Sequence, residues 1–191
     1  MLCGIVMGMT EDLTVCDASQ DDAAAIAEIY EHYVLESTAT FETEPPDEAE
    51  TARRIADIHD AGYPFLVTRD GSGRVVAFGF AHRYGPRNGY RYSVETTIFV
   101  RPDCVGRGIG GCLLTELVDA CERLGYRQAF AVIAASEPAS VVLHARAGYR
   151  PVGTLNGAGW KHDQWIDVFL MQRQLGEGNE TLPGEVPAGQ L

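Results

Sequence analysis

The sequence predicts a single α/β domain, in which a mixed sheet carries helices on its faces. Three observations support this class. The chain has 191 residues, which is the length of about one domain. Hydrophobic residues make up 46% of it and charged residues 22%, so the chain can form a core. Segments whose apolar side chains recur every three or four residues alternate with short apolar segments typical of strands.

Two helices and a hairpin are expected in the first half of the chain, after a short strand over residues 13–16. The first helix begins at Asp21, because apolar side chains then recur at helical spacing: Ile26, Ile29, Tyr30, Tyr33 and Val34. The remaining elements are a Thr- and Pro-rich loop over residues 37–46, a helix over 49–58, and strands over 64–68 and 74–82 joined by the turn Asp70-Gly71-Ser72-Gly73.

The second half is expected to extend the sheet. A long strand over residues 90–100 precedes a glycine-rich segment, and the helix that follows has a second apolar stripe: Leu113, Leu114, Leu117, Val118, Cys121 and Leu124. Gly125 ends this helix. The last elements are a strand over 128–134, a helix over 139–147, and strands near 150–154 and 165–174. We expect residues 1–9 to be loose, residues 10–175 to form the domain, and residues 176–191 to be a mobile tail.

The charge and cysteine content exclude several classes of protein. The chain carries 15 Lys and Arg against 27 Asp and Glu, a formal net charge of −12. Nucleic acids and anionic membranes bind basic faces, so neither is an expected partner. No apolar stretch is long enough for a bilayer span, and the N-terminal stretch does not have the pattern of a signal peptide. The five cysteines show no CxxC spacing, which argues against a metal site and favours reduced thiols in a cytoplasm.

The glycine-rich segment is the most informative part of the sequence. Gly106, Gly108, Gly110 and Gly111 stand where the long strand has ended and a helix begins. Amides at a helix start point outward at the positive end of the helix dipole, and glycine lets ligand oxygens approach them, so a phosphate or diphosphate fits here. Arg107 is a candidate for a charge-assisted contact. The alternative is a tight turn with no ligand, which four glycines in six residues make less favoured.

Two other phosphate-binding motifs fit this segment less well. It lacks the Lys-Ser/Thr pair of a P-loop, so ATP or GTP is disfavoured. Gly106, Gly108 and Gly111 do satisfy G-x-G-x-x-G, the dinucleotide pattern. A dinucleotide-binding fold has that turn after its first strand, with further βαβ units behind it. Here more than half of the chain precedes the turn, so NAD binding ranks below the next interpretation.

The segment Val105-Gly106-Arg107-Gly108-Ile109-Gly110 resembles the acetyl-CoA diphosphate loop of the GNAT N-acetyltransferases, with its pattern Gln/Arg-x-x-Gly-x-Gly/Ala. From about Ile26 to Leu175 the chain is similar to the phosphinothricin acetyltransferase subfamily, which includes enzymes acetylating methionine sulfone and sulfoximine. The matching segments are residues 40–45, 86–90, 94–100, 143–149 and 159–165. The resemblance implies a GNAT fold, whose mixed, mostly antiparallel and twisted sheet has splayed central strands. It also implies acetyl transfer from acetyl-CoA to the α-amino group of a small amino acid or analogue.

The resemblance further implies which residues contact acetyl-CoA. They are Ile98, Phe99, Val100, Val105, Gly106, Arg107, Gly108, Ile109, Gly110, Gly111, Glu137 and Ser140. In the family, backbone groups of the splayed strand bind the pantetheine like an added strand, and one N–H serves as the oxyanion donor. Val105 departs from the usual Gln or Arg, which we expect to weaken affinity rather than abolish function. Glu137 replaces an Asn, so its carboxylate either repels a phosphate or faces solvent.

Acyl transfer from a thioester to an amine needs a base, donors for the oxyanion and a route for the thiolate to leave. Glu95 is a carboxylate inside an apolar, Thr-rich strand, which is costly unless the group is used or paired. The resemblance implies that Glu95 is a general base acting through water; the residue alone also fits a solvent-facing carboxylate. His144 matches a position near the CoA sulfur, where it either protonates the thiolate or packs under the cofactor.

The acceptor pocket and the oligomer are also implied by the resemblance. Arg87 and Tyr90 match positions that hold the acid groups of the acceptor, and a guanidinium suits a carboxylate or phosphinate. Phe41, Thr97 and Phe99 are expected to line the pocket for the acceptor's side chain. The segment that holds Trp160, Lys161 and Trp165 resembles the family's C-terminal hairpin, which packs at a dimer interface near the site, so a homodimer is expected.

Two other functions stay open from the sequence. A GNAT enzyme acting on a polyamine or a protein N-terminus would suit the net charge of −12, although Arg87 argues against a cationic acceptor. A non-catalytic acyl-CoA sensor or nucleotide-binding module would leave Glu95 and Arg87 without a role.

Overall fold

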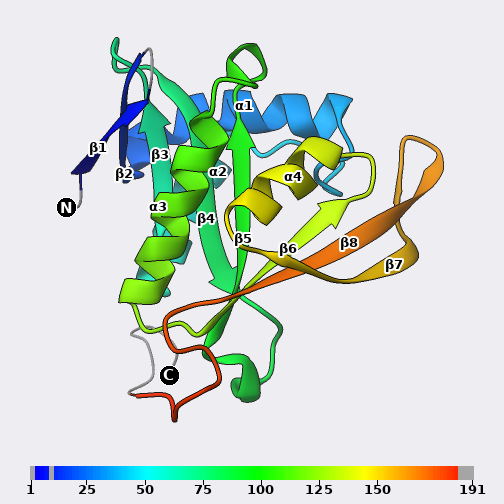
Figure 1. The fold of residues 1–191 in the computed structure, drawn as a ribbon. Helices are drawn as coiled ribbons and strands as arrows, with labels where there is room; N and C mark the ends of the chain where they lie inside the picture. The colour runs from blue at the N-terminus through cyan, green and yellow to red at the C-terminus, as the bar shows by residue number, and fades with distance from the viewer. Residues whose placement is uncertain (1–2, 9–10, 185–191) are drawn as a thin grey trace.

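The structure is a computed structural model that describes residues 3–8 and 11–184 (Figure 1). Within this part, one sheet of eight strands has the order β1-β2-β3-β4-β5-β6-β8-β7. Neighbouring strands are antiparallel except β5 and β6, which are parallel. The strands are β1 (Cys3–Gly8), β2 (Glu11–Asp17), β3 (Phe65–Arg69), β4 (Val75–Arg83), β5 (Ser93–Val100), β6 (Gln128–Ala134), β7 (Arg150–Lys161) and β8 (Gln164–Gln174).

Four helices cover the two faces of this sheet in the described part of the chain: α1 (Ala23–Glu36), α2 (Glu48–Asp60), α3 (Ile109–Arg123) and α4 (Pro138–Arg146). Helices α1 and α2 lie on one face, whereas α3 and α4 lie on the other (Figure 1). Short 3-10 turns occur at Gln20–Asp22, Asn88–Tyr90 and Pro102–Cys104. From β2 to β8, the order of elements expected from the sequence is confirmed.

Residues 3–8 form a strand, whereas the sequence predicts a loose segment over residues 1–9. Strand β1 pairs antiparallel with β2 from Cys3 to Gly8. The pairing supplies hydrogen-bond partners for the edge of β2, which otherwise would be the open edge of the sheet. Residues 1, 2, 9 and 10 lie outside the described residues.

Strand β7 is longer than the sequence predicts, since it continues to Lys161. The strand pairs with β8 across a two-residue turn, in which His162 and Asp163 have φ of 50° and 57°. Two successive residues with positive φ are typical of the tight hairpin turn that matches strand twist. Glycines and register shifts within β7 hide its strand pattern in the sequence.

Residues 176–184, the first part of the expected tail, turn back toward the start of β6. The Arg127 guanidinium donates to the hydroxyl of Thr181 at 3.1 Å and to the carbonyl of Leu182 at 3.2 Å. The Tyr92 hydroxyl donates to the carbonyl of Gly184 at 3.0 Å. Residues 185–191 lie outside the described residues.

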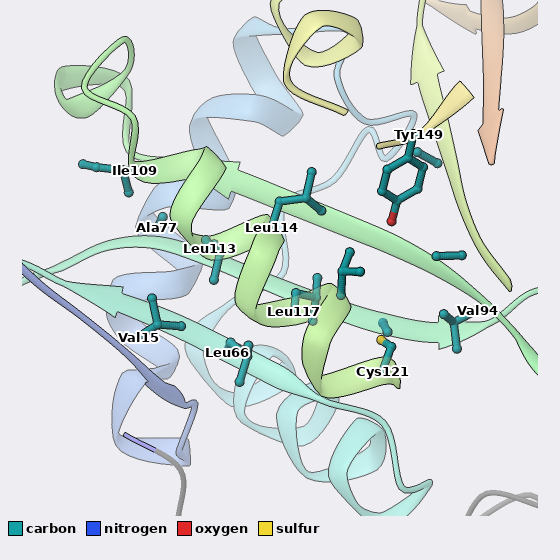
Figure 2. Packing of buried hydrophobic residues seen from close by; sticks show 14 of the residues in the cluster. Val15, Leu66, Ala77, Val94, Ile109, Leu113, Leu114, Leu117, Cys121 and Tyr149 are labelled. Carbon is teal, nitrogen blue, oxygen red and sulfur yellow. The ribbon is translucent and has the colours of Figure 1, made fainter. Parts of the chain in front are cut away.

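The apolar stripe predicted for α3 forms the centre of the larger core (Figure 2). Leu113, Leu114, Leu117, Val118 and Cys121 are completely buried against the sheet. Burying a side chain of the size of Leu stabilises the fold by about 1.5–3 kcal/mol. Leu124 is the exception: it is the C-cap residue and is 40% exposed, because the helix ends there before Gly125 at φ 91°.

A second core lies between the other face of the sheet and helices α1 and α2. Ile26 and Ile29 of α1 and Ile55 of α2 are almost fully buried, and they pack with aromatic side chains of β4 and β5. The rings of Phe78 and Phe99, which lie opposite each other in the β4–β5 pair, are 5.3 Å apart. These contacts hold the strands that carry the candidate site.

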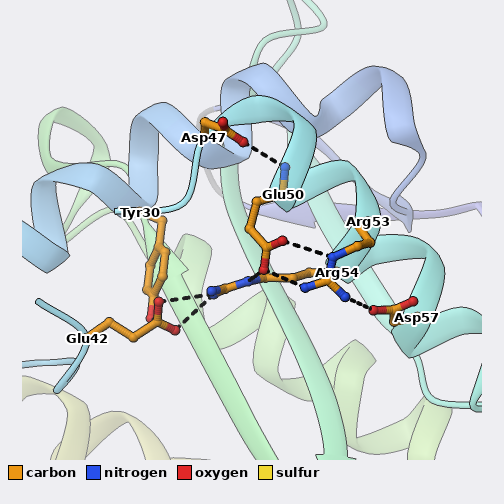
Figure 3. A network of polar contacts seen from close by, with 7 residues as sticks. All are labelled: Tyr30, Glu42, Asp47, Glu50, Arg53, Arg54 and Asp57. Carbon is orange, nitrogen blue, oxygen red and sulfur yellow. Dashed lines mark hydrogen bonds and ion pairs between the residues drawn. The ribbon is translucent and has the colours of Figure 1, made fainter. Parts of the chain in front are cut away.

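A polar network fixes the loop after α1 to helix α2 (Figure 3). The Arg54 guanidinium donates to both carboxylate oxygens of Glu42, at 2.9 and 3.1 Å, and to Glu50 at 2.8 Å. The Tyr30 hydroxyl donates to Glu42 at 3.0 Å. Asp47 is the N-cap of helix α2, and its side chain accepts a hydrogen bond from the Glu50 amide. The loop therefore has a defined position beside the sheet.

The hairpin of β7 and β8 is fixed to the same loop by Lys161, which is the one lysine of the sequence. Its side chain is only 4% exposed. The ammonium group donates to the carbonyl of Thr40 at 2.7 Å and to that of Tyr33 at 3.2 Å. Burial lowers the pKa of Lys161. A buried cation with two backbone acceptors therefore joins the C-terminal hairpin to the end of α1.

Candidate active site

A cavity of about 640 Å³ lies where β5 and β6 meet the N-terminal ends of α3 and α4. Its lining includes Thr97, His144 and every expected acetyl-CoA contact except Arg107: Ile98, Phe99, Val100, Val105, Gly106, Gly108, Ile109, Gly110, Gly111, Glu137 and Ser140. The Arg107 guanidinium instead lies 3.9 Å from the sulfur of Cys104. The fold thus brings segments far apart in the sequence to one concave surface.

The glycine-rich turn enters this cavity in a conformation that suits glycine. Gly106 and Gly108 have φ of 79° and 82°, which residues with a Cβ rarely adopt. No atom lies within 4 Å of the position that a Cβ would take at either glycine, so the turn is open on that side. Helix α3 begins at Ile109 and has no acidic side chain in its first turn. The Gly111 amide donates to the carbonyl of Gly108 at 3.0 Å, whereas the amides of Ile109 and Gly110 before it have no acceptor within the helix, so the positive end of the dipole faces the cavity.

The parallel strands β5 and β6 separate beside the cavity. They pair only from Ser93 with Gln128 to Glu95 with Phe130, although β5 continues to Val100 and β6 to Ala134. The parts of β5 and β6 that do not pair with each other both line the cavity. The separation confirms the splayed central strands expected from the sequence. It leaves backbone groups of β5 available to an extended ligand.

Glu95 lies at the last paired position before the strands separate. Its side chain is 25% exposed, and its Oε1 atom is 3.9 Å from Nε2 of His82. Burial raises the pKa of Glu95, and the neighbouring His82 partly offsets this increase. Glu95 does not itself line the cavity, whereas Thr96 and Thr97, the next residues of β5, do. A carboxylate with a raised pKa beside a cavity is suited to accept a proton at neutral pH.

His144 is held in one orientation inside the cavity. Its Nδ1 atom lies 2.8 Å from the carbonyl oxygen of Ser140 and so carries the hydrogen, because a carbonyl only accepts. Burial lowers the pKa of His144, which favours the neutral ring. In the described part of the chain, Nε2 is buried without a hydrogen-bond partner. A neutral His144 therefore presents a lone pair at Nε2, which suits accepting a hydrogen bond rather than donating one.

Glu137, one of the two departures from the family pattern, has a protein partner. The Ser37 hydroxyl donates to its carboxylate at 3.0 Å. The residue is half-buried at the N-cap of α4 and lines the cavity. Val105, the other departure, is 58% exposed at the mouth of the glycine-rich turn. Neither side chain blocks the cavity.

The residues expected to hold the acceptor are not gathered around this cavity, apart from Thr97 and Phe99. Arg87 is exposed at the N-cap of the 3-10 turn Asn88–Tyr90, in the loop between β4 and β5. Tyr90 is 41% exposed and packs edge-on against Tyr84, with ring centres 5.6 Å apart. Phe41 covers Gly159 of β7, where a Cβ would come within 2.1 Å of the ring. The loop that carries Arg87 does join β5 at the end near Glu95.

The structure adds cavity residues that sequence reasoning missed. Tyr33, which the helical spacing assigns to the core stripe, also lines the cavity, and its hydroxyl donates to the carbonyl of Val100 at 2.5 Å. The Thr38 hydroxyl contacts that of Ser136, which joins the loop after α1 to the end of β6. Because Thr38 and Ser136 are 98 positions apart, no local sequence pattern predicts their contact.

An acetyl-CoA molecule fits the chemistry of this cavity. The open glycine turn at the start of α3 offers amides to a diphosphate, the separated strand edge offers backbone groups to a pantetheine, and Nε2 of His144 is an unpaired buried acceptor. No group of three or more His, Cys, Asp or Glu side chains in the described residues is arranged to hold a metal ion. Among the helices described, none is long and apolar enough to cross a bilayer.

The fold and the cavity together define an acyl-CoA-dependent transferase of the GNAT class. Residues 17–170 match the family model described as acetyltransferase (GNAT) domain, and the chain belongs to this family. The chain is 41% identical to the phosphinothricin N-acetyltransferase of Alcaligenes faecalis, over 89% of this chain and 86% of the relative. It is 33% identical to an L-methionine sulfoximine/L-methionine sulfone acetyltransferase of Salmonella typhimurium, over 86% and 96% of the two chains.

A solved structure supports the same assignment. A phosphinothricin acetyltransferase of Sinorhizobium meliloti, solved in complex with acetyl-CoA, superposes on this chain with a TM-score of 0.90. The two are 42% identical, and the match covers 95% of this chain and 97% of the other. The expected GNAT fold is therefore confirmed.

Proposed function

We propose that this protein transfers the acetyl group of acetyl-CoA to the α-amino group of a small amino acid or amino acid analogue. The observation that carries the proposal is the continuous cavity from the glycine-rich turn to the point where β5 and β6 separate next to Glu95. Relatives at 41% and 33% identity are named for phosphinothricin, methionine sulfoximine and methionine sulfone. These three compounds are the first acceptors to test.

In this mechanism the chain first binds and orients acetyl-CoA. The amides of Gly108 to Gly110 hold the diphosphate at the positive end of α3, and β5 beyond Glu95 holds the pantetheine through its backbone. One backbone N–H of that strand end stabilises the oxyanion that forms when the amine attacks the thioester. The side chain of Val105 takes no part, so its departure from the family pattern costs affinity at most.

Glu95 then acts as the general base. An α-amino group has a pKa of about 7.7–8.0, so much of it is protonated at neutral pH and cannot attack until a proton is removed. The carboxylate of Glu95 accepts that proton through a bridging water, after which the free amine attacks the carbonyl carbon. The C–S bond then breaks, and the second proton of the attacking nitrogen leaves with CoA as its thiol. His144 is neutral in the resting enzyme, so its Nε2 atom receives a hydrogen bond from the bound reactants.

The acid group of the acceptor binds Arg87 in our proposal. The loop of Arg87 joins β5 at Ser93, two residues before Glu95, so a small acceptor spans from Arg87 toward Glu95. A guanidinium makes two parallel hydrogen bonds to a carboxylate or phosphinate. Tyr90 of the same loop and Phe41, whose side chains are both partly exposed, border the acceptor in our proposal.

The C-terminal hairpin forms the interface of a homodimer in our proposal. Trp160 and Trp165 lie opposite each other on β7 and β8, with ring centres 5.2 Å apart. They are 53% and 69% exposed, and Val152 and Leu155 on the edge strand β7 are also exposed. Exposed tryptophans on a hairpin at the sheet edge are typical anchors of a protein interface. A second copy of the chain is the partner that the family relationship favours.

The experiment that tests this function is an acetyl-transfer assay with thiol detection. The purified chain is mixed with acetyl-CoA and, one at a time, phosphinothricin, methionine sulfone, methionine sulfoximine, spermidine and a peptide with a free N-terminus. We expect acceptor-dependent CoA release with at least one of the first three. Release with spermidine or the peptide alone would contradict the proposed acceptor class, and no release with any acceptor would contradict an amine acetyltransferase.

A further inference from the structure

Glu95 has a titratable neighbour directly across the β4–β5 pair. His82 is its register partner, so the two side chains project from the same face of the sheet. Nε2 of His82 and Oε1 of Glu95 are 3.9 Å apart. This distance is too long for a hydrogen bond, but a small side-chain rotation or one bridging water joins the two groups.

The imidazole ring of His82 is oriented to receive a proton. Its Nδ1 atom lies 3.1 Å from the carbonyl oxygen of Arg83. Because a carbonyl only accepts, Nδ1 carries the hydrogen in the neutral ring, and Nε2 presents its lone pair toward Glu95. A protonated Glu95 carboxyl group therefore has an acceptor on its own side of the sheet.

His82 also connects Glu95 with solvent. Its side chain is 42% exposed, compared with 25% for Glu95. It lines a second cavity, of about 380 Å³, which lies between helices α1 and α2 and strand β4. A proton that reaches the imidazole is therefore within reach of water, whereas a proton on the more buried carboxylate is less accessible.

The other titratable groups around this second cavity already have partners. They are Tyr30, Glu42, Arg54 and Asp57, and all four belong to the network of Figure 3. Glu42 is paired with Arg54 at 2.9 Å, and Asp57 is paired with Arg53 at 2.5 Å. On the strand of His82 itself, Arg83 donates to Asn88 at 3.2 Å. The charged neighbour that affects the pKa of Glu95 is His82, which lowers it against the effect of burial.

We propose that His82 is a positioning residue through which Glu95 passes the acceptor's proton to solvent. Glu95 takes one proton from the ammonium group of the acceptor and becomes a neutral carboxyl group. That carboxyl group gives the proton to Nε2 of His82, which restores the carboxylate and forms an imidazolium. The imidazolium then releases one proton to water, so the pair of Glu95 and His82 returns to its initial charge. This inference rests on the proposed role of Glu95 as the base.

Removal of the ring tests the relay in the active enzyme. We expect His82→Asn to lower kcat by about tenfold, which is less than the loss expected for the base itself, with the KM for acetyl-CoA unchanged. Added imidazole should restore the rate of this variant in proportion to its concentration and leave the wild type unaffected. The matched control is His59→Asn in α2, which should show neither effect. An unchanged kcat, or a loss that imidazole does not restore, would overturn the relay.

A second measurement separates the pair from the catalytic activity. The Glu95 carboxyl group is titrated by carbon-13 NMR in the folded chain, without acetyl-CoA or acceptor. Because an imidazolium stabilises the neighbouring carboxylate, the midpoint of Glu95 should rise in His82→Asn and in His82→Gln. An unchanged midpoint in both variants would overturn the coupling. If the midpoint rises while the wild type acetylates no amine, the pair stands and the proposed function fails.

Discussion

Glu95 of β5 and Phe130 of β6 form the last paired position of the two parallel strands, and beyond it the strands separate around a cavity. The carboxylate proposed as the base therefore lies where the ordered pairing of the sheet ends and the unpaired strand edge begins. Desolvation by the sheet raises its pKa, and the unpaired edge beside it lies open to a ligand. This relationship joins the architecture of the sheet to the proposed chemistry.

Substitution of the proposed base should separate catalysis from cofactor binding. We expect Glu95→Gln to lower kcat by about 10²–10⁴-fold, because a general base contributes a factor of this size. The KM for acetyl-CoA should change little, since Glu95 does not line the cofactor cavity. Steady-state kinetics between pH 6 and 8 provide the measurement. Wild-type activity in the variant across this range would remove Glu95 from the role of base.

The same substitution should change stability in a pH-dependent way. The folded protein holds the Glu95 proton more tightly than the unfolded chain, so stability falls as pH rises from the usual glutamate range through the raised pKa. Glu95→Gln removes this loss, so its Tm should exceed that of the wild type at pH 7, and the difference should shrink toward pH 4. Thermal unfolding at both pH values measures it.

Glu28 provides a control for that experiment, because its pKa shifts in the opposite direction to that of Glu95. Glu28 pairs with Arg101 at 2.6 Å, and this partner lowers the pKa of Glu28. Glu28→Gln should therefore lower Tm at pH 7, if only slightly, because the pair is exposed. A Tm gap for Glu95→Gln that is equal at pH 4 and pH 7 would count against a raised pKa at Glu95.

The glycine-rich turn should be needed for acetyl-CoA binding as well as for stability. Gly108 at φ 82° and Gly73 at φ 85° both have open space where a Cβ would lie, so alanine at either strains the backbone alike. That strain is about 1–2 kcal/mol for each. Only Gly108→Ala should also weaken acetyl-CoA binding, which isothermal titration measures. Equal affinities in the two variants would show that the turn at Gly108 does not contact the cofactor.

Lys161 should resist chemical modification until the chain unfolds. Its ammonium group is buried on the carbonyls of Tyr33 and Thr40, so an amine-reactive reagent should label Lys161 only in denaturant. Lys161→Met should destabilise the fold by about 1–3 kcal/mol, because two buried carbonyls lose their donor. Mass spectrometry and urea unfolding give the two readouts. Fast native labelling of Lys161 would contradict this anchor.

The exposed tryptophans should hold the proposed dimer together. We expect Trp165→Ala to shift the chain from dimer to monomer in light scattering after size exclusion, because a large apolar anchor of the interface is lost. The control is Leu182→Ala, which removes a 92% exposed apolar side chain away from the hairpin and should leave the mass unchanged. A wild-type protein that is monomeric at micromolar concentration would refute the hairpin dimer.

The sequence predicts this fold well where the signal is local. The helical spacing of Leu113, Leu117 and Cys121 fixes the buried face of α3, and Gly108 and Gly125 mark its start and end because both have positive φ. The separation of β5 from β6 is not encoded by spacing; it was expected from the family resemblance and appears in the pairing that ends at Glu95.

The parts that the sequence does not predict depend on contacts between distant segments. Nothing near His82 indicates that it faces Glu95, because the register of β4 against β5 decides this. The glycines of β7 interrupt the alternating pattern that would predict a strand. Gly159 is one of them, and the ring of Phe41 lies so close to it that no side chain would fit there. The acceptor residues Arg87 and Tyr90 match family positions, yet their loop leaves both exposed in the single chain.

A crystal structure of this chain with acetyl-CoA tests the central claim most directly. We predict the diphosphate on the amides at the start of α3, from Gly108 to Gly110, and the thioester beside the part of β5 that is not paired with β6, within one water of the Glu95 carboxylate. A diphosphate bound elsewhere, or a thioester separated from Glu95 by protein atoms, would contradict the account.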